Sequence, residues 1–266
     1  MFTDFTIRKG EADRKDEADR APPPGAGPDW TIPQNWERFT PEEHGVWDRL
    51  FARQQEKLAG RVVRAFADGL DLLRLSRPGI PRLEELNERL FRRTGWTIVS
   101  VPGLVPDEVF FRHLSRRQFP AGNFIRPASQ LDYLEEPDLF HDLFGHVPML
   151  ADARMAAFMQ TLGDLGLATS PGADARISRL YWYTVEFGLA REAGELRIYG
   201  AGLASSFGEA GFALESPQPR RLPFDVARIL RTRYRSDRFQ DRYFVIGQLD
   251  ELPERVSTAV SETLLG

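Results

Sequence analysis

The sequence predicts a single folded domain that is mainly α with a small amount of β. Three observations carry this prediction. Apolar residues recur mostly at spacings of three and four, the period of helices buried along one face. Short extended segments are too few for a large sheet. Beyond residue 30, Ser, Gly and Pro residues nowhere gather into a linker long enough to divide two domains.

The first 29 residues are expected to be a disordered leader. Residues 8–27 alternate acidic and basic side chains with alanine and include the run Pro22-Pro23-Pro24-Gly25. Such a segment buries too little apolar surface to offset its chain entropy. We therefore expect a leader at residues 1–29 and one domain at residues 30–266.

The first long helix is expected at residues 42–66. Val46 and Leu50 begin its buried apolar stripe. Thr40 is a favourable N-cap residue, and Pro41 suits the first helical position because its missing N–H needs no partner there.

The remaining elements follow from the same two periodicities. Further helices are expected at residues 82–95, 106–116, 151–166, 175–193 and 223–233. Extended segments are expected at residues 96–101, 196–199 and 243–246.

Composition excludes several classes of protein. The net charge of −4 and the scattered basic residues favour neither a nucleic-acid partner nor an anionic membrane. The absence of cysteine excludes disulfides, thiolate nucleophiles and iron–sulfur clusters, so any metal must sit on nitrogen and oxygen ligands. No apolar run approaches ~18 residues, and the N-terminus lacks a signal-peptide core. A cytoplasmic protein is expected.

Two of the four histidines, His141 and His146, lie close together. On an undistorted helix, residues five apart differ by about 140° in azimuth, so these two cannot share a face unless the helix ends between them. Gly145 and Pro148 are typical of such an ending. We expect the helix to end there and the two imidazoles to converge.

Glu186 is the acidic residue expected beside them. It lies in the most aromatic helical segment of the chain, one turn after Trp182, so its carboxylate should point inward. A buried carboxylate needs a cation or metal. Two histidines and one carboxylate form the facial triad of non-haem Fe(II) oxygenases. From these residues alone, a structural histidine pair and a Glu–Arg ion pair stay open as alternatives.

Five motifs occur in order between residues 102 and 245. They are Asn123-Phe124-Ile125-Arg126-Pro127, Glu136-Pro137-Asp138, His141 with Gly145-His146-Val147-Pro148, the run from Tyr181 to Gly188, and the run from Tyr199 to Glu209. In content and spacing the set resembles the pterin-dependent aromatic amino acid hydroxylases. The resemblance implies a single, mostly helical catalytic domain of that family's type.

The resemblance also implies a reaction. One Fe(II) would be held by His141, His146 and Glu186, and a tetrahydropterin similar to tetrahydrobiopterin would supply two electrons. Dioxygen would give one atom to the substrate ring and the other to the pterin. L-Phenylalanine hydroxylated to L-tyrosine is the expected reaction, because tryptophan-specific relatives usually have phenylalanine where this chain has Trp182. Hydroxylation of tyrosine or tryptophan is the alternative within the family.

Other roles carry over one residue at a time. Arg126 matches an arginine that binds the substrate carboxylate, and Asp138 matches the acid that steadies it. The other residues expected on the substrate side are Tyr133, Pro137, Trp182, Phe187, Ser205 and Glu209. The residues expected on the pterin side are Gly103, Leu104, Val105, Phe110, Asp142 and Tyr181.

Two other classes of function, a zinc hydrolase and a binding module, remain open, and the protein is expected to be a monomer. A zinc hydrolase could use two histidines and a glutamate, although the H-E-x-x-H pattern of many such enzymes is absent. A metal-stabilised binding module would lack turnover. Too few residues follow Gln248 for the long tetramerisation helix of the animal relatives, so a monomer is expected.

Overall fold

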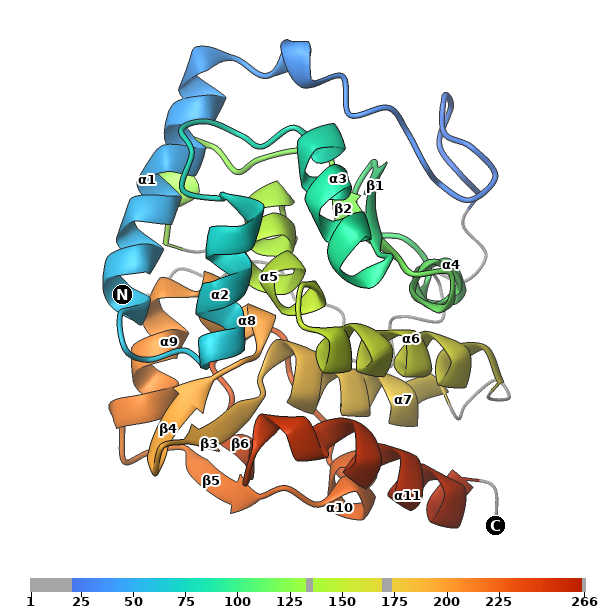
Figure 1. The fold of residues 1–266 in the computed structure, drawn as a ribbon, viewed down its shortest axis with the longest axis vertical. Helices are drawn as coiled ribbons and strands as arrows, with labels where there is room; N and C mark the ends of the chain where they lie inside the picture. The colour runs from blue at the N-terminus through green and yellow to red at the C-terminus, as the bar shows by residue number, and fades with distance from the viewer. Residues whose placement is uncertain (1–20, 133–135, 169–173, 265–266) are drawn as a thin grey trace.

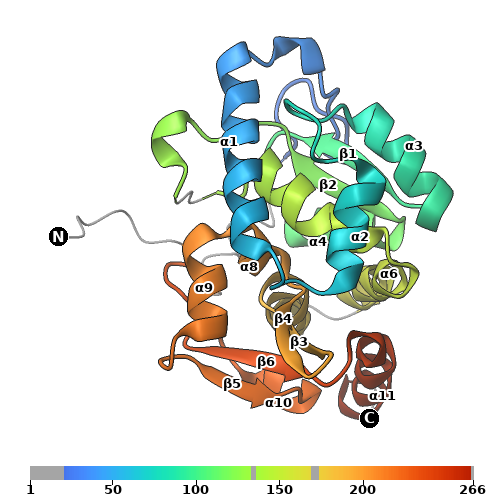
Figure 2. The same ribbon diagram turned by 60° about the vertical axis from the view of Figure 1, so that its left-hand side comes forward.

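The computed structural model describes residues 21–132, 136–168 and 174–264. Helices surround two small sheets that lie in different parts of the molecule (Figures 1 and 2). One part holds α1 to α4 with the β1–β2 pair, and the other holds β3 to β6 with α9 to α11. The predicted class, mainly α with a small amount of β in one domain, is confirmed.

The helical elements are of three kinds. The α-helices are α1 (Pro41–Leu58), α2 (Arg64–Leu73), α3 (Leu83–Thr94), α4 (Asp107–Ser115), α5 (Val147–Leu150), α6 (Ala153–Ala168), α7 (Asp174–Tyr181), α8 (Ala201–Ser205), α9 (Phe207–Glu215), α10 (Val226–Arg231) and α11 (Leu252–Leu264). The 3₁₀ turns are η2 (Trp36–Arg38), η3 (Ala128–Gln130) and η6 (Leu249–Glu251). The π-helical turns are η4 (His141–His146) and η5 (Trp182–Glu186).

The strands form one pair and one four-stranded sheet. They are β1 (Thr97–Val101), β2 (Gln118–Gly122), β3 (Leu189–Glu192), β4 (Glu195–Ile198), β5 (Arg220–Pro223) and β6 (Arg242–Ile246). β1 and β2 are parallel, with Thr97 opposite Gln118. The larger sheet has the order β4-β3-β6-β5, in which only the β3–β4 pair is antiparallel. The sequence predicted β1, β4 and β6 but missed β2, β3 and β5.

The helix expected at residues 42–66 is wrong in its second half. It begins as predicted, with a capping box in which the Thr40 hydroxyl accepts from the Glu43 N–H and the Glu43 carboxylate accepts from the Thr40 N–H. It ends at Leu58, because Gly60 takes a positive φ of 69° that a helix cannot contain. The chain then starts α2. The helices predicted at 82–95, 106–116 and 151–166 form as α3, α4 and α6.

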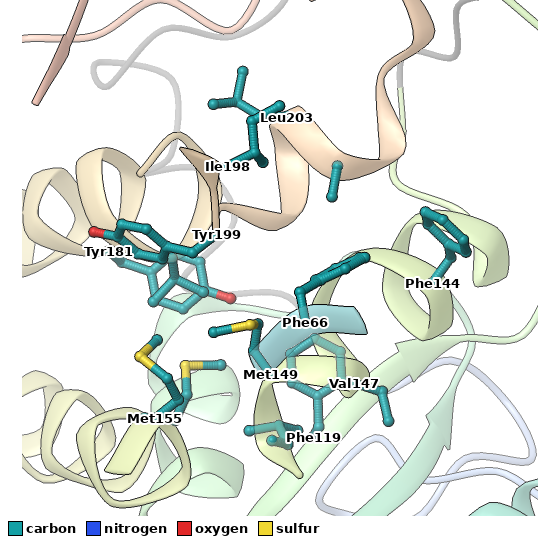
Figure 3. Close-up of a cluster of buried hydrophobic side chains, with 14 of the residues drawn as sticks. Phe66, Phe119, Phe144, Val147, Met149, Met155, Tyr181, Ile198, Tyr199 and Leu203 are labelled. Carbon is teal, nitrogen blue, oxygen red and sulfur yellow. The ribbon is translucent and has the colours of Figure 1, made fainter. Parts of the chain in front are cut away.

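The core packs α2 directly against the segment that carries the two histidines. Gly69 of α2 lies so close to α5 that a Cβ would stand 2.1 Å from the carbonyl oxygen of Pro148. The ring of Phe144 stacks on that of Phe140 at 4.9 Å and meets Phe66 edge-on at 5.9 Å. Figure 3 shows Phe66, Phe144, Val147 and Met149 in this buried cluster. Burying side chains of this size stabilises the fold by about 1.5–3 kcal/mol each and fixes the histidine segment in place.

The division of the chain at residue 30 stays a prediction. Residues 1–20 lie outside the described part, and Asp29 accepts a hydrogen bond through its carbonyl from the buried side chain of His113, 2.8 Å away. Among the described residues, no helix is both long and apolar enough to cross a lipid bilayer.

Candidate metal and substrate site

His141 and His146 are brought together by a π-helical turn. The segment hydrogen-bonds from residue i to residue i+5, as in the bond from the Val147 N–H to the Asp142 carbonyl, so residues five apart lie one above the other. The two Nε2 atoms are 3.1 Å apart. The expectation that the helix ends between them is therefore wrong. The helix widens instead and continues as α5.

Gly145 has a different role from the predicted helix ending. A Cβ at this position would lie 2.9 Å from the carbonyl oxygen of Ala201. The glycine therefore allows α8 to approach the π-turn closely. This approach places Ser205, at the end of α8, beside His141.

Glu186 lies at the end of the second π-turn and faces both imidazoles. Its carboxylate oxygens are 3.1 Å from the Nε2 atom of His146 and 3.7 Å from that of His141. The helix predicted at 175–193 is wrong beyond this point. The Phe187 N–H bonds to the Trp182 carbonyl, which closes the turn, and the chain enters β3 at Leu189. The glutamate thus stands at a helix end and not in the middle of a helix.

Asp142 is a second carboxylate at the same place. It offers an oxygen within 4.8 Å of ligand atoms of His141 and His146, so distance alone would also permit a His-Asp-His group. However, Glu186 lies nearer to both Nε2 atoms, which point toward each other. One oxygen of Asp142 accepts the Gly122 N–H at 2.7 Å. The geometry therefore favours Glu186 as the carboxylate of the triad and Asp142 as its neighbour.

The tautomer of His141 is set by Ser205. The Ser205 hydroxyl donates its proton to the Ala201 carbonyl at 2.8 Å, so it can only accept from the Nδ1 atom of His141, also 2.8 Å away. With its proton on Nδ1, the ring carries its lone pair on Nε2. Such a hydrogen bond orients a metal-binding imidazole and raises its basicity.

Burial and charge act differently on the two imidazoles. Burial lowers the pKa of His141 to about 4, although the Glu186 charge opposes this effect, so the ring is neutral near pH 7. Burial also lowers the pKa of His146, but the charge and hydrogen bond of Glu186 outweigh it and raise that pKa above its usual value. Without a bound cation, the glutamate thus attracts a proton to His146. A divalent ion would satisfy the same carboxylate.

Arg126 and Asp138 form a buried bidentate pair. The Nε and Nη2 atoms of Arg126 donate to the two carboxylate oxygens of Asp138 at 2.9 and 2.8 Å. The same carboxylate accepts the backbone N–H groups of Arg126 and His141. Burial raises the pKa of Asp138, but the hydrogen bonds and charge of Arg126 lower it by more, so this pKa lies below its usual value. The aspartate thus holds the arginine in one orientation, next to the first histidine.

Trp182, at the start of the second π-turn, packs between two aromatic rings. The ring of Trp182 lies between Phe187, at 4.7 Å, and Tyr234, which stacks on it at 4.2 Å and 11°. The indole N–H of Trp182 donates to the Gln240 side chain at 3.1 Å. Tyr234 and Gln240 were not predicted at the site, because both lie in an irregular segment whose sequence shows no periodicity.

Glu209 lies behind this aromatic wall. One of its oxygens accepts the Tyr243 hydroxyl and the Gln240 backbone N–H, both at 2.8 Å. Burial raises the pKa of its carboxyl to about 7, although the two hydrogen bonds lower it. The carboxyl contacts the segment that carries the wall, and it forms no hydrogen bond to the two histidines among the described residues.

Two of the residues expected on the pterin side, Phe110 and Tyr181, lie near His146. The ring of Phe110 meets that of Tyr181 edge-on at 5.3 Å, and the Tyr181 hydroxyl is 3.4 Å from the Nδ1 atom of His146. The Leu104 N–H donates to the Glu136 carboxylate at 3.0 Å.

Gly103, in the loop at 102–105, and Gly122 both lie near the ring of Phe124, and Gly122 also lies near Asp142. A Cβ on Gly103 would lie 2.6 Å from the Glu136 carboxylate and 3.9 Å from the Phe124 ring. A Cβ on Gly122 would lie 3.5 Å from the same ring, from the Pro137 carbonyl and from Asp142. Val105, the last residue of this loop, is half-buried. Tyr133, also expected at the site, lies outside the described residues.

Comparison with known proteins agrees with the fold. The family model for biopterin-dependent aromatic amino acid hydroxylases matches residues 31–263. The phenylalanine-4-hydroxylase of Caulobacter vibrioides is 55% identical over 240 residues, which cover 90% of this chain and 82% of that protein.

Two crystal structures of Chromobacterium violaceum phenylalanine hydroxylase are also similar. One, with bound iron(III) and oxidised 7,8-dihydrobiopterin, has a TM-score of 0.85 at 40% identity over 98% of this chain and 94% of that one. The other, with iron and phenylalanine bound, has a TM-score of 0.85 at 41% identity over 94% and 91%. The chain belongs to the biopterin-dependent aromatic amino acid hydroxylases.

Proposed function

We propose that this protein is a phenylalanine 4-hydroxylase, which converts L-phenylalanine to L-tyrosine with dioxygen and a tetrahydropterin. One atom of dioxygen enters the ring as the new hydroxyl, and the other leaves on the pterin, which gives up two electrons. The observation that carries the proposal is the convergence of His141, His146 and Glu186, whose facing atoms lie 3.1–3.7 Å apart. The similarity to phenylalanine-4-hydroxylases over most of the chain supports the choice of substrate.

The three side chains suit an Fe(II) ion. They offer two imidazole nitrogens and one carboxylate, and the sequence has no thiolate that would favour a different metal. Ser205 leaves the His141 lone pair on Nε2, which faces the glutamate. When bound, the ion would supply the oxidation chemistry with dioxygen, because a triad of this kind leaves coordination positions open. Iron in the Chromobacterium structures supports this choice of metal.

Arg126 is proposed to bind the substrate carboxylate. Its Nε and Nη2 atoms are occupied by Asp138, and no acceptor in the described part of the chain is in hydrogen-bond geometry with Nη1. A planar guanidinium that is locked on one edge can present the other edge to a carboxylate. Trp182, Phe187 and Pro137 are proposed to enclose the substrate ring.

The pterin is proposed to bind on the opposite side of the histidine pair. Phe110 offers a half-buried aromatic face next to Tyr181. The backbone of Gly103, Leu104 and Val105 is proposed to hydrogen-bond to the pterin ring. Asp142, whose carboxylate accepts the Gly122 N–H, is also proposed to lie beside the pterin.

Product analysis tests the proposal. The protein is reconstituted with Fe(II) without oxygen, then given a tetrahydropterin, air and each of the three aromatic amino acids in turn. The expected result is tyrosine from phenylalanine in a one-to-one ratio with oxidised pterin, with less product from the other two substrates. Hydrolytic activity with Zn(II) and none with Fe(II) would defeat the proposal and favour a hydrolase. No tyrosine with Fe(II) and no other turnover would favour a binding module.

The proposal includes a monomer that acts in the cytoplasm and needs no nucleic-acid or membrane partner. Sedimentation equilibrium of the purified protein tests the first point, and a mass near twice 30.3 kDa would contradict it. Cell fractionation tests the second.

A further inference from the structure

Gln240 is a buried polar residue that connects three parts of the molecule. Its side-chain oxygen accepts the Trp182 indole N–H at 3.1 Å. Its side-chain nitrogen donates to the carbonyls of Arg235 and Arg238 at 2.8 and 3.2 Å. Its backbone N–H donates to Glu209 at 2.8 Å. No motif of the family resemblance includes it.

The orientation of the Gln240 amide follows from its partners. The two carbonyls of Arg235 and Arg238 can only accept, so they must face the NH₂ group. The indole nitrogen of Trp182 can only donate, so it must face the oxygen. Reversing the amide would therefore break all three hydrogen bonds at once. The oxygen is held toward the indole.

The backbone of Gln240 is held from behind. Glu209 accepts its N–H, and the same oxygen of Glu209 accepts the hydroxyl of the fully buried Tyr243. The position of the Gln240 oxygen is therefore determined by α9 and β6 as well as by its own loop.

The indole of Trp182 needs this directional contact. Tyr234 stacks on it at 4.2 Å with an interplanar angle of 11°, and stacking of this kind resists tilting much more than sliding or turning within the ring plane. A hydrogen bond to the indole N–H restricts sliding and turning of the ring within its plane, because the bond weakens steeply away from its preferred angle. The face of Trp182 beside Phe187 is then presented in one orientation.

We propose that Gln240 is a positioning residue for the substrate ring, which acts by fixing the in-plane orientation of Trp182 through its side-chain oxygen. This inference rests on the proposed function, in which Trp182 borders the ring of phenylalanine. Binding of the substrate ring would then depend partly on Gln240, which lies in the segment at residues 232–241 and outside the helices that supply the triad.

A double-mutant cycle tests the inference. Gln240→Met removes the hydrogen-bonding amide at similar side-chain length, and Trp182→Phe removes the indole N–H. In the otherwise wild-type protein, Gln240→Met should raise KM for phenylalanine about five- to tenfold, as expected for one buried neutral hydrogen bond, with kcat changed less and iron content normal. In the Trp182→Phe background, the same substitution should change KM less than twofold. Equal fold-changes in the two backgrounds would overturn the inference.

Tryptophan emission gives a readout that does not need turnover. Gln240→Met should shift the emission spectrum of the five-tryptophan protein, and the shift should vanish in the Trp182→Phe background. The matched control, Gln218→Met, changes an exposed glutamine and should alter neither emission nor KM. A shift that persists without Trp182 would show a general loosening and contradict the inference.

An NMR measurement on the wild-type protein covers the case in which Gln240→Met does not fold. The indole proton of Trp182, identified by its loss in Trp182→Phe, should exchange slowly with solvent. Rapid exchange would overturn the inference. If the wild-type protein forms no tyrosine, the proposed function fails, whereas emission and exchange still report whether Gln240 holds Trp182.

Discussion

The Nε2 atoms of His141 and His146 lie 3.1 Å apart although the two residues are five positions apart in a continuous helical segment. An α-helix would point them in different directions, and the π-turn removes the difference. Glu186 ends a second π-turn and reaches the same point. Both segments that supply the proposed ligands therefore use the same rare backbone geometry, which is often found at functional sites.

Arg126→Lys should weaken phenylalanine binding and leave the metal in place. Lysine keeps the charge but loses the planar fork that contacts Asp138 and the proposed substrate carboxylate. KM for phenylalanine should rise about tenfold or more, because hydrogen bonds to charged groups contribute about 1.5–3 kcal/mol. Steady-state kinetics and iron analysis check this. The control is Arg92→Lys, because Arg92 is exposed and pairs with Glu88 one helical turn away; this variant should change neither KM nor iron content. An unchanged KM in Arg126→Lys would refute the proposed role of Arg126.

Two adjacent serines should give opposite results. Ser205→Ala removes the acceptor that fixes the His141 tautomer, so iron affinity should fall about 10–100-fold with little loss of stability. Ser206→Ala removes the N-cap of α9, where the side chain accepts the Glu209 N–H, and should cost about 1 kcal/mol of stability without changing iron affinity. Competitive chelator titration and thermal unfolding measure the two effects. The same response in both variants would argue against a specific role for Ser205.

Glu209 should make the protein less stable as the pH rises. Below about pH 4.5 the carboxyl is protonated in both the folded and the unfolded chain. Because burial raises its pKa in the folded protein to about 7, the unfolded chain loses the proton first, and the free energy of unfolding falls between these two pH values. The loss is about 3 kcal/mol at ~1.4 kcal/mol per pKa unit.

Glu209→Gln is the variant that measures this effect. It keeps an oxygen that accepts from Tyr243 and Gln240 but cannot ionise. Relative to the wild type, it should be more stable at pH 8 and similar at pH 4.5, in denaturant titrations at both values. A difference that does not depend on pH would exclude the shifted carboxyl.

Gly69→Ala should destabilise the protein because α2 lies against α5. The added Cβ would fall 2.1 Å from the Pro148 carbonyl oxygen, which is backbone and cannot move without shifting the segment after His146. A loss of about 1–3 kcal/mol is expected, measured as a lower Tm. Gly45→Ala, in α1, is the matched control. Its Cβ meets nothing within 4 Å, so it should stabilise the helix by about 0.5–1 kcal/mol.

The sequence predicted helices better than it predicted their ends. The stripe that starts at Val46 established α1, but it could not locate the break at Gly60, since the stripe continues through Val62 on the next segment. Strand β3 was missed because Leu189 follows an aromatic run with helical spacing. Only the pairing with β4 and β6 makes it a strand.

At the site, residue types were predictable and backbone geometry was not. The histidine pair and Glu186 were found from clustering and an apolar setting. The π-turns were not, because their i→i+5 bonds depend on tertiary packing that local propensity does not encode. Gln240 carried no signal, since its partners Trp182 and Glu209 are distant in the chain.

The most direct test is the iron content after anaerobic reconstitution with Fe(II), measured in the wild type, Glu186→Gln and Asp142→Asn. Both carboxylates lie beside the histidines, but only Glu186 is within 3.1–3.7 Å of both facing nitrogens. We predict close to one iron per chain in the wild type and in Asp142→Asn, and little iron in Glu186→Gln. Full iron in Glu186→Gln together with loss of iron in Asp142→Asn would contradict the proposed triad.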